Sequence, residues 1–151
     1  MNKNLKFLLI VSVNIFSFNA LYAQTWQSNM QTAKERANEL DRNLALLFTG
    51  SDWCTACVKL KREVLDSEVF MSYAADNLIL IKADFPRKRK NRLSEEQQEI
   101  NNKLAEQFNP NGYYPLIVVM SPKGQVLGYL GYMNLPPEKY ISIFRGFRRK
   151  S

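Results

Sequence analysis

The chain has 151 residues, a formal net charge of +7, two cysteines and no histidine. A structural zinc site needs about four cysteine or histidine ligands, so this inventory argues against zinc, and we expect no metal and no cofactor. The length suits one domain with a hydrophobic core of its own.

Residues 1–23 have the pattern of a secretory signal peptide rather than of a folded element. Lys3 and Lys6 give a basic start, residues 7–18 are mostly apolar, and Ala23 is a small residue at the expected cleavage site. The apolar stretch is shorter than the roughly 20 residues that a membrane-spanning helix needs, and an uncleaved anchor is the alternative interpretation. We therefore predict a signal peptide over residues 1–23.

Cleavage before Gln24 would leave residues 24–151 as a single domain. The cleavage removes two lysines and no acidic residue, so the formal charge would fall from +7 to +5. No later stretch is apolar enough to span a membrane. We expect the mature protein to be periplasmic or secreted, in a compartment where disulfides can form.

The first half of this domain predicts helices that alternate with buried strands. Apolar residues recur at helical spacing from Trp26 to Leu40. The apolar run of residues 44–49 has the length of a strand, and residues 77–85 predict a second strand that is covered on both faces. Between the strands we expect a helix after Cys57 and a short helix, capped at Asp66-Ser67, that contains Val69, Phe70 and Tyr73.

The second half predicts a helix, a β-hairpin and a closing helix. Ser94 and Gln97 form a capping box at the first helix, and residues 109–112 end it. A strand at residues 116–120 and its partner at residues 126–132 flank a turn. We expect the first of these helices to bury Ile100, Leu104 and Phe108. The last helix begins at Pro136-Pro137 and presents one apolar face, made of Tyr140, Ile141, Phe144 and Phe147. It ends in a basic cluster of Arg145, Arg148, Arg149 and Lys150.

Residues 86–92, here called the basic loop, contain five basic residues in seven positions. The loop lacks the interleaved aromatic residues of a single-strand nucleic-acid binder, and an exported chain rarely meets nucleic acid, so we expect no nucleic-acid partner. A solvated, mobile loop is the favoured interpretation. A docking patch for an acidic partner is the alternative.

The two cysteines, Cys54 and Cys57, stand where the first strand gives way to a helix. The strand ends near Gly50, and Cys54 falls at or near the first turn of the helix, where unpaired N–H groups and the helix dipole favour a thiolate. Cys57 lies about one turn later, within reach of Cys54, which indicates a redox pair. A static disulfide is the alternative, although so short a loop stabilises the fold only weakly.

The order of elements resembles that of the thioredoxin fold, an α/β fold with a central mixed sheet of about four strands and helices on both faces. The residues 53–57, Trp-Cys-Thr-Ala-Cys, are similar to the W-C-x-x-C motif of that family, and Tyr114-Pro115 is similar to its cis-proline site. The resemblance covers about residues 26–149. The amino-acid sequences of residues 48–54 and of the Asp84-Phe85-Pro86 stretch are similar to those of exported bacterial thioredoxin-like proteins and of the C-terminal domain of the periplasmic transmembrane disulfide reductase.

The resemblance implies a role for each residue of the site. Cys54 would be the exposed nucleophile and Cys57 the buried resolving thiol. Pro115 in the cis form would present the backbone of Tyr114 to an extended substrate chain. Trp53 would shield the sulfurs and contact substrate, or serve only in packing.

Three positions depart from the family pattern. Phe48 stands where many thioredoxins bury an aspartate, so the proton acceptor for Cys57 is open, with Asp52 and Asp84 as candidates. Leu116 follows the proline where threonine is common. Thr55-Ala56 replaces the Gly-Pro of general thioredoxins, and such residues influence the reduction potential.

Two functions fit these observations. The first is an exported, reductase-like thiol–disulfide oxidoreductase, which we expect to be a monomer that acts on protein thiol or disulfide substrates and on a redox partner. The second is a non-catalytic binding or holdase module of the same fold. That module would use Tyr113, Tyr114 and the basic loop as a docking face.

Overall fold

The sheet at the centre of the molecule has four strands in the order β2-β1-β3-β4. The computed structural model describes residues 26–147. Strand β1 (Asn43–Thr49) is parallel to β2 (Leu78–Asp84) and antiparallel to β3 (Leu116–Met120). Strand β4 (Val126–Leu130) is antiparallel to β3 at one edge.

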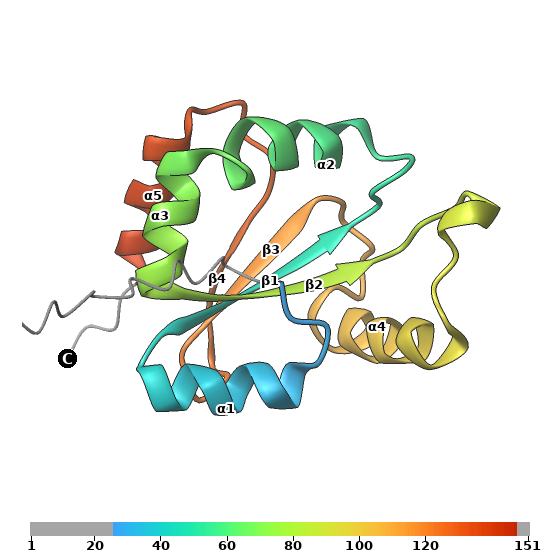
Figure 1. Cartoon of the computed structure of the whole chain (residues 1–151), viewed down its shortest axis with the longest axis horizontal. Helices are drawn as coiled ribbons and strands as arrows, with labels where there is room; N and C mark the ends of the chain where they lie inside the picture. Colours follow the sequence, from blue (N-terminus) through green and yellow to red (C-terminus); the bar gives the residue numbers. More distant parts are fainter. Residues whose placement is uncertain (1–25, 148–151) are drawn as a thin grey trace, which may run out of the picture.

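Helices cover both faces of this sheet (Figure 1). Helices α1 (Met30–Leu40) and α4 (Glu95–Phe108) lie on one face. On the opposite face lie α2 (Thr55–Leu60), its π-helical continuation η1 (Lys61–Leu65), α3 (Glu68–Asn77) and α5 (Pro137–Gly146). A short 3₁₀ turn, η2 (Arg89–Asn91), lies in the basic loop. The predicted α/β class and its mixed sheet are confirmed.

Two hydrophobic cores form because successive strand residues point to opposite faces of the sheet. Along β1, Leu44, Leu46 and Phe48 pack with α1 and α4, whereas Ala45 and Leu47 pack with the helices of the other layer. Each of these five side chains is buried. A strand buried on both faces explains why residues 44–49 are apolar without alternation.

The first helix starts later than the sequence pattern predicts. Trp26 and Gln27 are not helical, because Gln27 runs beside β2, where its N–H donates to Leu80 O at 2.8 Å and its carbonyl accepts from Lys82 N–H at 2.9 Å. Helix α1 begins at Met30 after Asn29, whose side chain caps the helix by accepting from the N–H groups of residues 31 and 32. Extension of the sheet edge therefore replaces the first predicted turn.

Three further details differ from the sequence predictions. The helix predicted after Cys57 changes to π-helical geometry at Lys61. Ser94 Oγ accepts from Gln97 N–H as predicted. Within residues 26–147 the Ser94 N–H does not bond the Gln97 side chain, whose amide nitrogen donates to Ser28 O and Asn101 Oδ1, so only half of the capping box forms. Strand β4 ends at Leu130, two residues before the predicted end.

Some predictions fall on residues outside the described range. The signal peptide over residues 1–23 and the end of the basic cluster, residues 148–150, are among them. Within residues 26–147, no helix combines the length and the apolar character that crossing a membrane requires.

Candidate active site

The two cysteines lie at the end of β1, where the chain turns into α2. Cys54 is the N-cap residue of α2, and its N–H donates to Gly50 O at 2.9 Å. The N–H of Trp53 donates to the same carbonyl at 3.3 Å. This tight turn, residues 50–54 and here called the active-site turn, holds the motif against the end of the sheet.

Cys54 and Cys57 form a disulfide with Cα atoms 5.2 Å apart. Each sulfur also accepts a backbone hydrogen bond: Cys57 N–H donates to Cys54 Sγ at 3.1 Å, and Gly50 N–H donates to Cys57 Sγ at 3.5 Å. Donors aimed at both sulfurs would stabilise either one as a thiolate after reduction, because a hydrogen bond to the charged form favours it.

Exposure separates the two cysteines less than the resemblance implies. Cys54 is 6 % exposed and Cys57 is 3 % exposed, so the expectation of an openly exposed Cys54 is wrong for this disulfide form. Cys54 is covered because its side chain, at the N-cap, folds back over the first turn of α2. There its sulfur is bonded to Cys57 Sγ and accepts a hydrogen bond from Cys57 N–H. Its assignment as the nucleophile stays a prediction.

The Tyr114-Pro115 peptide bond is cis, as the resemblance implies, and Pro115 is buried. Leu116, the next residue, pairs with Phe48 near the end of β1, which places the proline at the same end of the sheet as the cysteines. The Tyr114 ring lies edge-on to Trp53, with centroids 5.5 Å apart. The structure therefore brings together residues that are about 60 positions apart in the sequence.

Buried Asn109 shapes the loop before the cis-proline. Its side-chain amide donates to Tyr113 O at 2.8 Å, and its Oδ1 accepts from Tyr113 N–H at 2.9 Å. The sequence predicts Asn109 only as one of the residues that end a helix. Nothing in that pattern indicates that its side chain also bonds the backbone of Tyr113. Tyr113 itself is 62 % exposed.

The Trp53 ring is held on three sides. Its Nε1–H donates to Phe85 O at 2.8 Å, and the Arg87 guanidinium lies 3.7 Å from the ring centroid. Gly50 lies directly under the ring, where a Cβ would come within 2.3 Å of it. Trp53 therefore has a definite packing role and forms part of the wall beside the cysteines.

Asp52 anchors the basic loop to this turn. Its carboxylate accepts from the N–H groups of Arg87 and Lys88 and from Asn91 Nδ2, each at 2.9 Å. The Arg87 N–H bond, helped by Asn91 and Lys88, holds the pKa of Asp52 below its usual value. The loop is exposed, as predicted, but it is attached to the active-site turn. Sequence reasoning missed this attachment, because its partners are 35 to 39 positions away.

Asp84 makes a different contact. Its Oδ1 accepts from Ser51 N–H at 3.0 Å, and its carbonyl accepts from Asn101 Nδ2 at 2.8 Å. Among the described residues, the hydrogen bonds of Asp52 and Asp84 come from nitrogen donors and neither carboxylate bonds to a sulfur. The role of either as proton acceptor for Cys57 stays a prediction.

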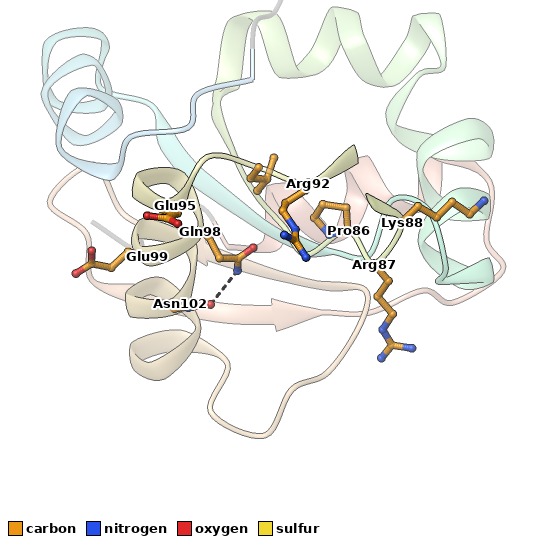
Figure 2. Close-up of a pocket in the computed structure, with 9 residues that line it drawn as sticks. Pro86, Arg87, Lys88, Arg92, Glu95, Gln98, Glu99 and Asn102 are labelled. Carbon is orange, nitrogen blue, oxygen red and sulfur yellow. Dashed lines mark hydrogen bonds between the residues drawn. The ribbon is translucent and has the colours of Figure 1, made fainter. Parts of the chain in front are cut away.

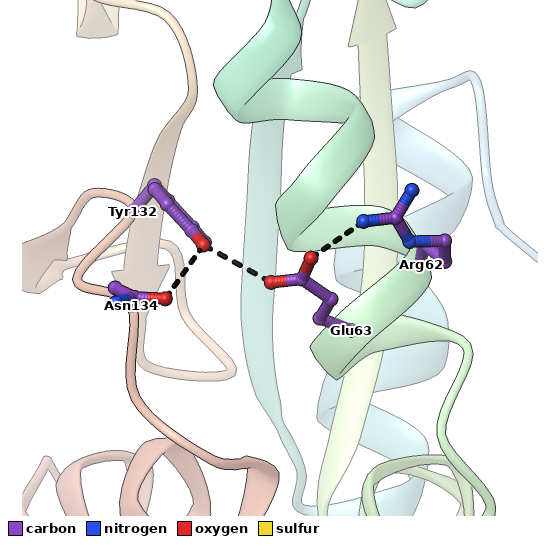
Figure 3. A network of polar contacts seen from close by, with 4 residues as sticks. All are labelled: Arg62, Glu63, Tyr132 and Asn134. Atoms are coloured by element: carbon purple, nitrogen blue, oxygen red, sulfur yellow. Dashed lines mark hydrogen bonds and ion pairs between the residues drawn. The ribbon is translucent and has the colours of Figure 1, made fainter.

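A third segment, residues 131–134, lies beside the cis-proline and is tied to η1. A Cβ on Gly131 would lie 3.8 Å from Pro115 O. The Tyr132 hydroxyl donates to Glu63 Oε2 at 3.0 Å, and Asn134 Oδ1 lies 3.1 Å from the same Tyr132 hydroxyl (Figure 3). Arg62 bonds the other Glu63 oxygen at 2.6 Å, and with Tyr132 it lowers the pKa of Glu63. Burial, helped by the Glu63 carboxylate, raises the pKa of Tyr132.

Comparison with known proteins agrees with this geometry. A family profile described as thioredoxin-like matches residues 25–122. The disulfide bond reductase DsbH of Chlamydia pneumoniae is 34 % identical over 117 residues, which cover 78 % of this chain and 68 % of the relative. The thioredoxin-related protein DsbJ of the same organism is 26 % identical over 106 residues, which cover 70 % of this chain but only 30 % of that protein.

Two solved structures have the same overall fold. A DsbH oxidoreductase structure superposes with a TM-score of 0.76 at 28 % identity, over 84 % of this chain and 85 % of the other. The oxidised C-terminal domain of Neisseria meningitidis DsbD superposes with a TM-score of 0.57 at 17 % identity, over 82 % of this chain and the whole of that domain. At that identity the second likeness supports the fold alone.

Proposed function

Because this chain belongs to the thioredoxin-like family, we propose that it is an exported thiol–disulfide oxidoreductase that reduces disulfides of protein substrates. One observation carries the proposal: the Cys54–Cys57 disulfide lies at the start of α2, beside the cis peptide of Pro115. The reductive direction rests on the similarity to a protein named as a disulfide bond reductase. Export rests on the pattern of residues 1–23.

The reaction begins from the dithiol form. The Cys54 thiolate attacks one sulfur of the substrate disulfide, the substrate S–S bond breaks, and the first substrate sulfur leaves and takes a proton from solvent. Cys57 then loses its proton, and its thiolate attacks Cys54 Sγ. The Cys54–Cys57 bond re-forms, the bond between Cys54 and the substrate breaks, and the second substrate sulfur leaves as a thiolate that takes a proton from solvent.

Two electrons and two protons therefore pass from the protein dithiol to the substrate. A partner dithiol reductant must return the oxidised pair to the dithiol form. The hydrogen bonds from Cys57 N–H and Gly50 N–H suit each step in which a sulfur carries negative charge. The extended substrate chain would pair with the backbone of Tyr114.

Insulin reduction in the presence of dithiothreitol tests the activity. The parent protein should accelerate insulin reduction well above the dithiothreitol background, and Cys54→Ser should fall to that background. A parent rate equal to that of Cys54→Ser would reject the proposal. Capture of a protein partner that persists after both cysteines are replaced would instead favour the binding module.

The identity of the nucleophile is tested by trapping and by alkylation. Cys57→Ser should accumulate a mixed disulfide between Cys54 and substrate, because the resolving thiol is missing. Limited alkylation of the reduced parent at mildly acidic pH should label Cys54 first, since it lies at the helix start. Mass mapping of the labelled peptides reads the result. First labelling at Cys57 would contradict the assignment.

A further inference from the structure

The basic loop is attached to the active-site turn and does not stand away from it. The Asp52 carboxylate, two residues before Cys54, accepts three hydrogen bonds from the loop. The Arg87 guanidinium lies 3.7 Å from the Trp53 ring centroid, next in the chain to Cys54. The backbone of the loop is therefore attached to the turn that carries Cys54, and the Arg87 side chain is held over the Trp53 ring.

The charges of the loop are available to a partner. Its five basic side chains are exposed, and within residues 26–147 none of them forms an ion pair with an acidic side chain. The hydrogen bonds of the Asp52 carboxylate come from backbone N–H groups and an asparagine amide, and of the loop cations only the charge of Lys88 contributes to its lowered pKa. The five basic residues are Arg87, Lys88, Arg89, Lys90 and Arg92.

The loop also forms one wall of a groove that faces α4. A groove of about 420 Å³ separates it from α4, whose wall carries Glu95 and Glu99. Arg87, Lys88 and Arg92 also line this groove; the Lys88 side chain extends away from α4, whereas Arg92 lies between the loop and α4 (Figure 2). Arg89 and Lys90 are not among the residues that line the groove, so the positive charge of the loop extends beyond it.

We propose that the basic loop docks an acidic segment of the protein whose disulfide is exchanged at Cys54. The inference rests on the proposed function and adds a substrate class to it: disulfides flanked by aspartate or glutamate. Charge complementarity identifies the occupant, because exposed cations without an ion-pair partner favour carboxylates and raise the rate of encounter. The attachment to the active-site turn favours a segment of the reacting protein over an anionic membrane surface, since a flanking segment would be held beside the sulfurs.

A pair of peptide substrates tests the proposal. Each carries one cysteine blocked as a mixed disulfide with a small thiol; glutamates flank the cysteine in one peptide and glutamines in the other. Single-turnover reduction by the reduced protein gives a rate for each peptide. The ratio of the two rates cancels any change in the intrinsic reactivity of Cys54, because both peptides react with the same nucleophile.

The parent should reduce the glutamate peptide roughly tenfold faster at low salt, and high salt should remove most of the preference. Lys88→Gln/Lys90→Gln should lower the ratio by about three- to tenfold, because it removes two loop charges and keeps the backbone N–H that bonds Asp52. Arg36→Gln/Lys123→Gln is the matched control, which removes the same charge from exposed positions on α1 and on the β3–β4 turn. The control should keep the parent ratio.

The remaining outcomes are decisive as well. A parent that reduces both peptides equally, or a ratio that falls equally in both variants, overturns the docking proposal alone. Binding to vesicles of anionic phospholipid that only the loop variant loses, with an unchanged peptide ratio, also overturns it. A parent that reduces neither peptide overturns the proposed function. Docking is then decided with the Cys54→Ser/Cys57→Ser protein and a glutamate peptide that has no cysteine. If this protein binds the peptide and the loop substitutions abolish the binding, the docking proposal is supported. If this protein does not bind the peptide, the docking proposal is overturned.

Discussion

At the scale of single residues, Gly50 has the least room for change. A Cβ at this position would lie 2.3 Å from Cε2 of Trp53, and the ring cannot move freely because Phe85 O and Arg87 hold it. Gly50→Ala should therefore lower the free energy of unfolding by about 1–3 kcal/mol, as measured by urea denaturation.

Gly146→Ala is the control for this substitution. Its Cβ would meet nothing within 4 Å at the end of α5, so alanine there should leave stability equal or slightly higher. A Gly50→Ala protein as stable as the parent would show that the Trp53 ring adjusts without cost. The packing role assigned to Trp53 would then be wrong.

Asp52 gives the active-site turn a dependence on acid. Its hydrogen bonds from Arg87, Lys88 and Asn91 lower its folded-state pKa below the usual value of about 3.9. A group with a lowered pKa stabilises the fold above its unfolded pKa, and that stability is lost as the pH falls through the folded pKa. The attachment of the basic loop should therefore weaken only below about pH 4.

Trp53 fluorescence can report this loss, because the Arg87 guanidinium lies over its ring. In oxidised protein that carries Trp26→Phe, the Trp53 spectrum should be constant near neutrality and change below about pH 4. Asp52→Asn should show a changed spectrum at neutral pH and no acid titration. An Asp52→Asn protein that titrates as the parent does would contradict the anchor.

Residues of the site were predictable where the signal is short in sequence. Cys54, Cys57 and Trp53 belong to one motif, and Pro115 is a single residue before a strand. Asp52 and Asn109 were not identified in their observed roles. Asp52 acts through donors far along the chain, and Asn109 acts on the backbone of the next loop. Neither effect leaves a pattern in neighbouring residues.

At the scale of elements, β4 and α5 meet at a glycine. A Cβ on Gly128 would lie 2.1 Å from Cε1 of Phe147, just past the end of α5. Gly128→Ala should lower the free energy of unfolding by about 1–3 kcal/mol. Combining it with Phe147→Leu, which shortens the opposing side chain, should recover part of that loss, with a coupling of about 0.5–3 kcal/mol in a double-mutant cycle. Strictly additive effects would mean that the two residues do not constrain each other.

The element boundaries show where local patterns reach their limit. Trp26 continues the apolar spacing of α1, but the segment around it pairs with the edge of β2, a contact that depends on tertiary structure. The π-helical geometry of η1, where Val64 and Leu65 are buried, has no signal in the apolar spacing of the sequence either. By contrast, β3 has the predicted bounds, since proline and a turn mark its two sides.

At the scale of the whole molecule, the order of elements was sufficient to predict the layers. Two strands buried on both faces require helices above and below them, and a parallel pair requires a crossover connection. The distribution of charge around the active site was not predictable in the same way. The sequence shows five cations in residues 86–92, but only the fold shows that Asp52 attaches them beside Cys54.

Export is the last property of the whole chain that the sequence predicts, and it concerns residues outside the described range. The basic start, apolar stretch and small Ala23 predict cleavage before Gln24. Intact-mass measurement of protein recovered from its native envelope should give a chain that begins at Gln24. Ala23→Phe should block cleavage at this point, because the site requires a small residue. A mature form that retains residues 1–23 would reject the signal peptide and favour the uncleaved anchor.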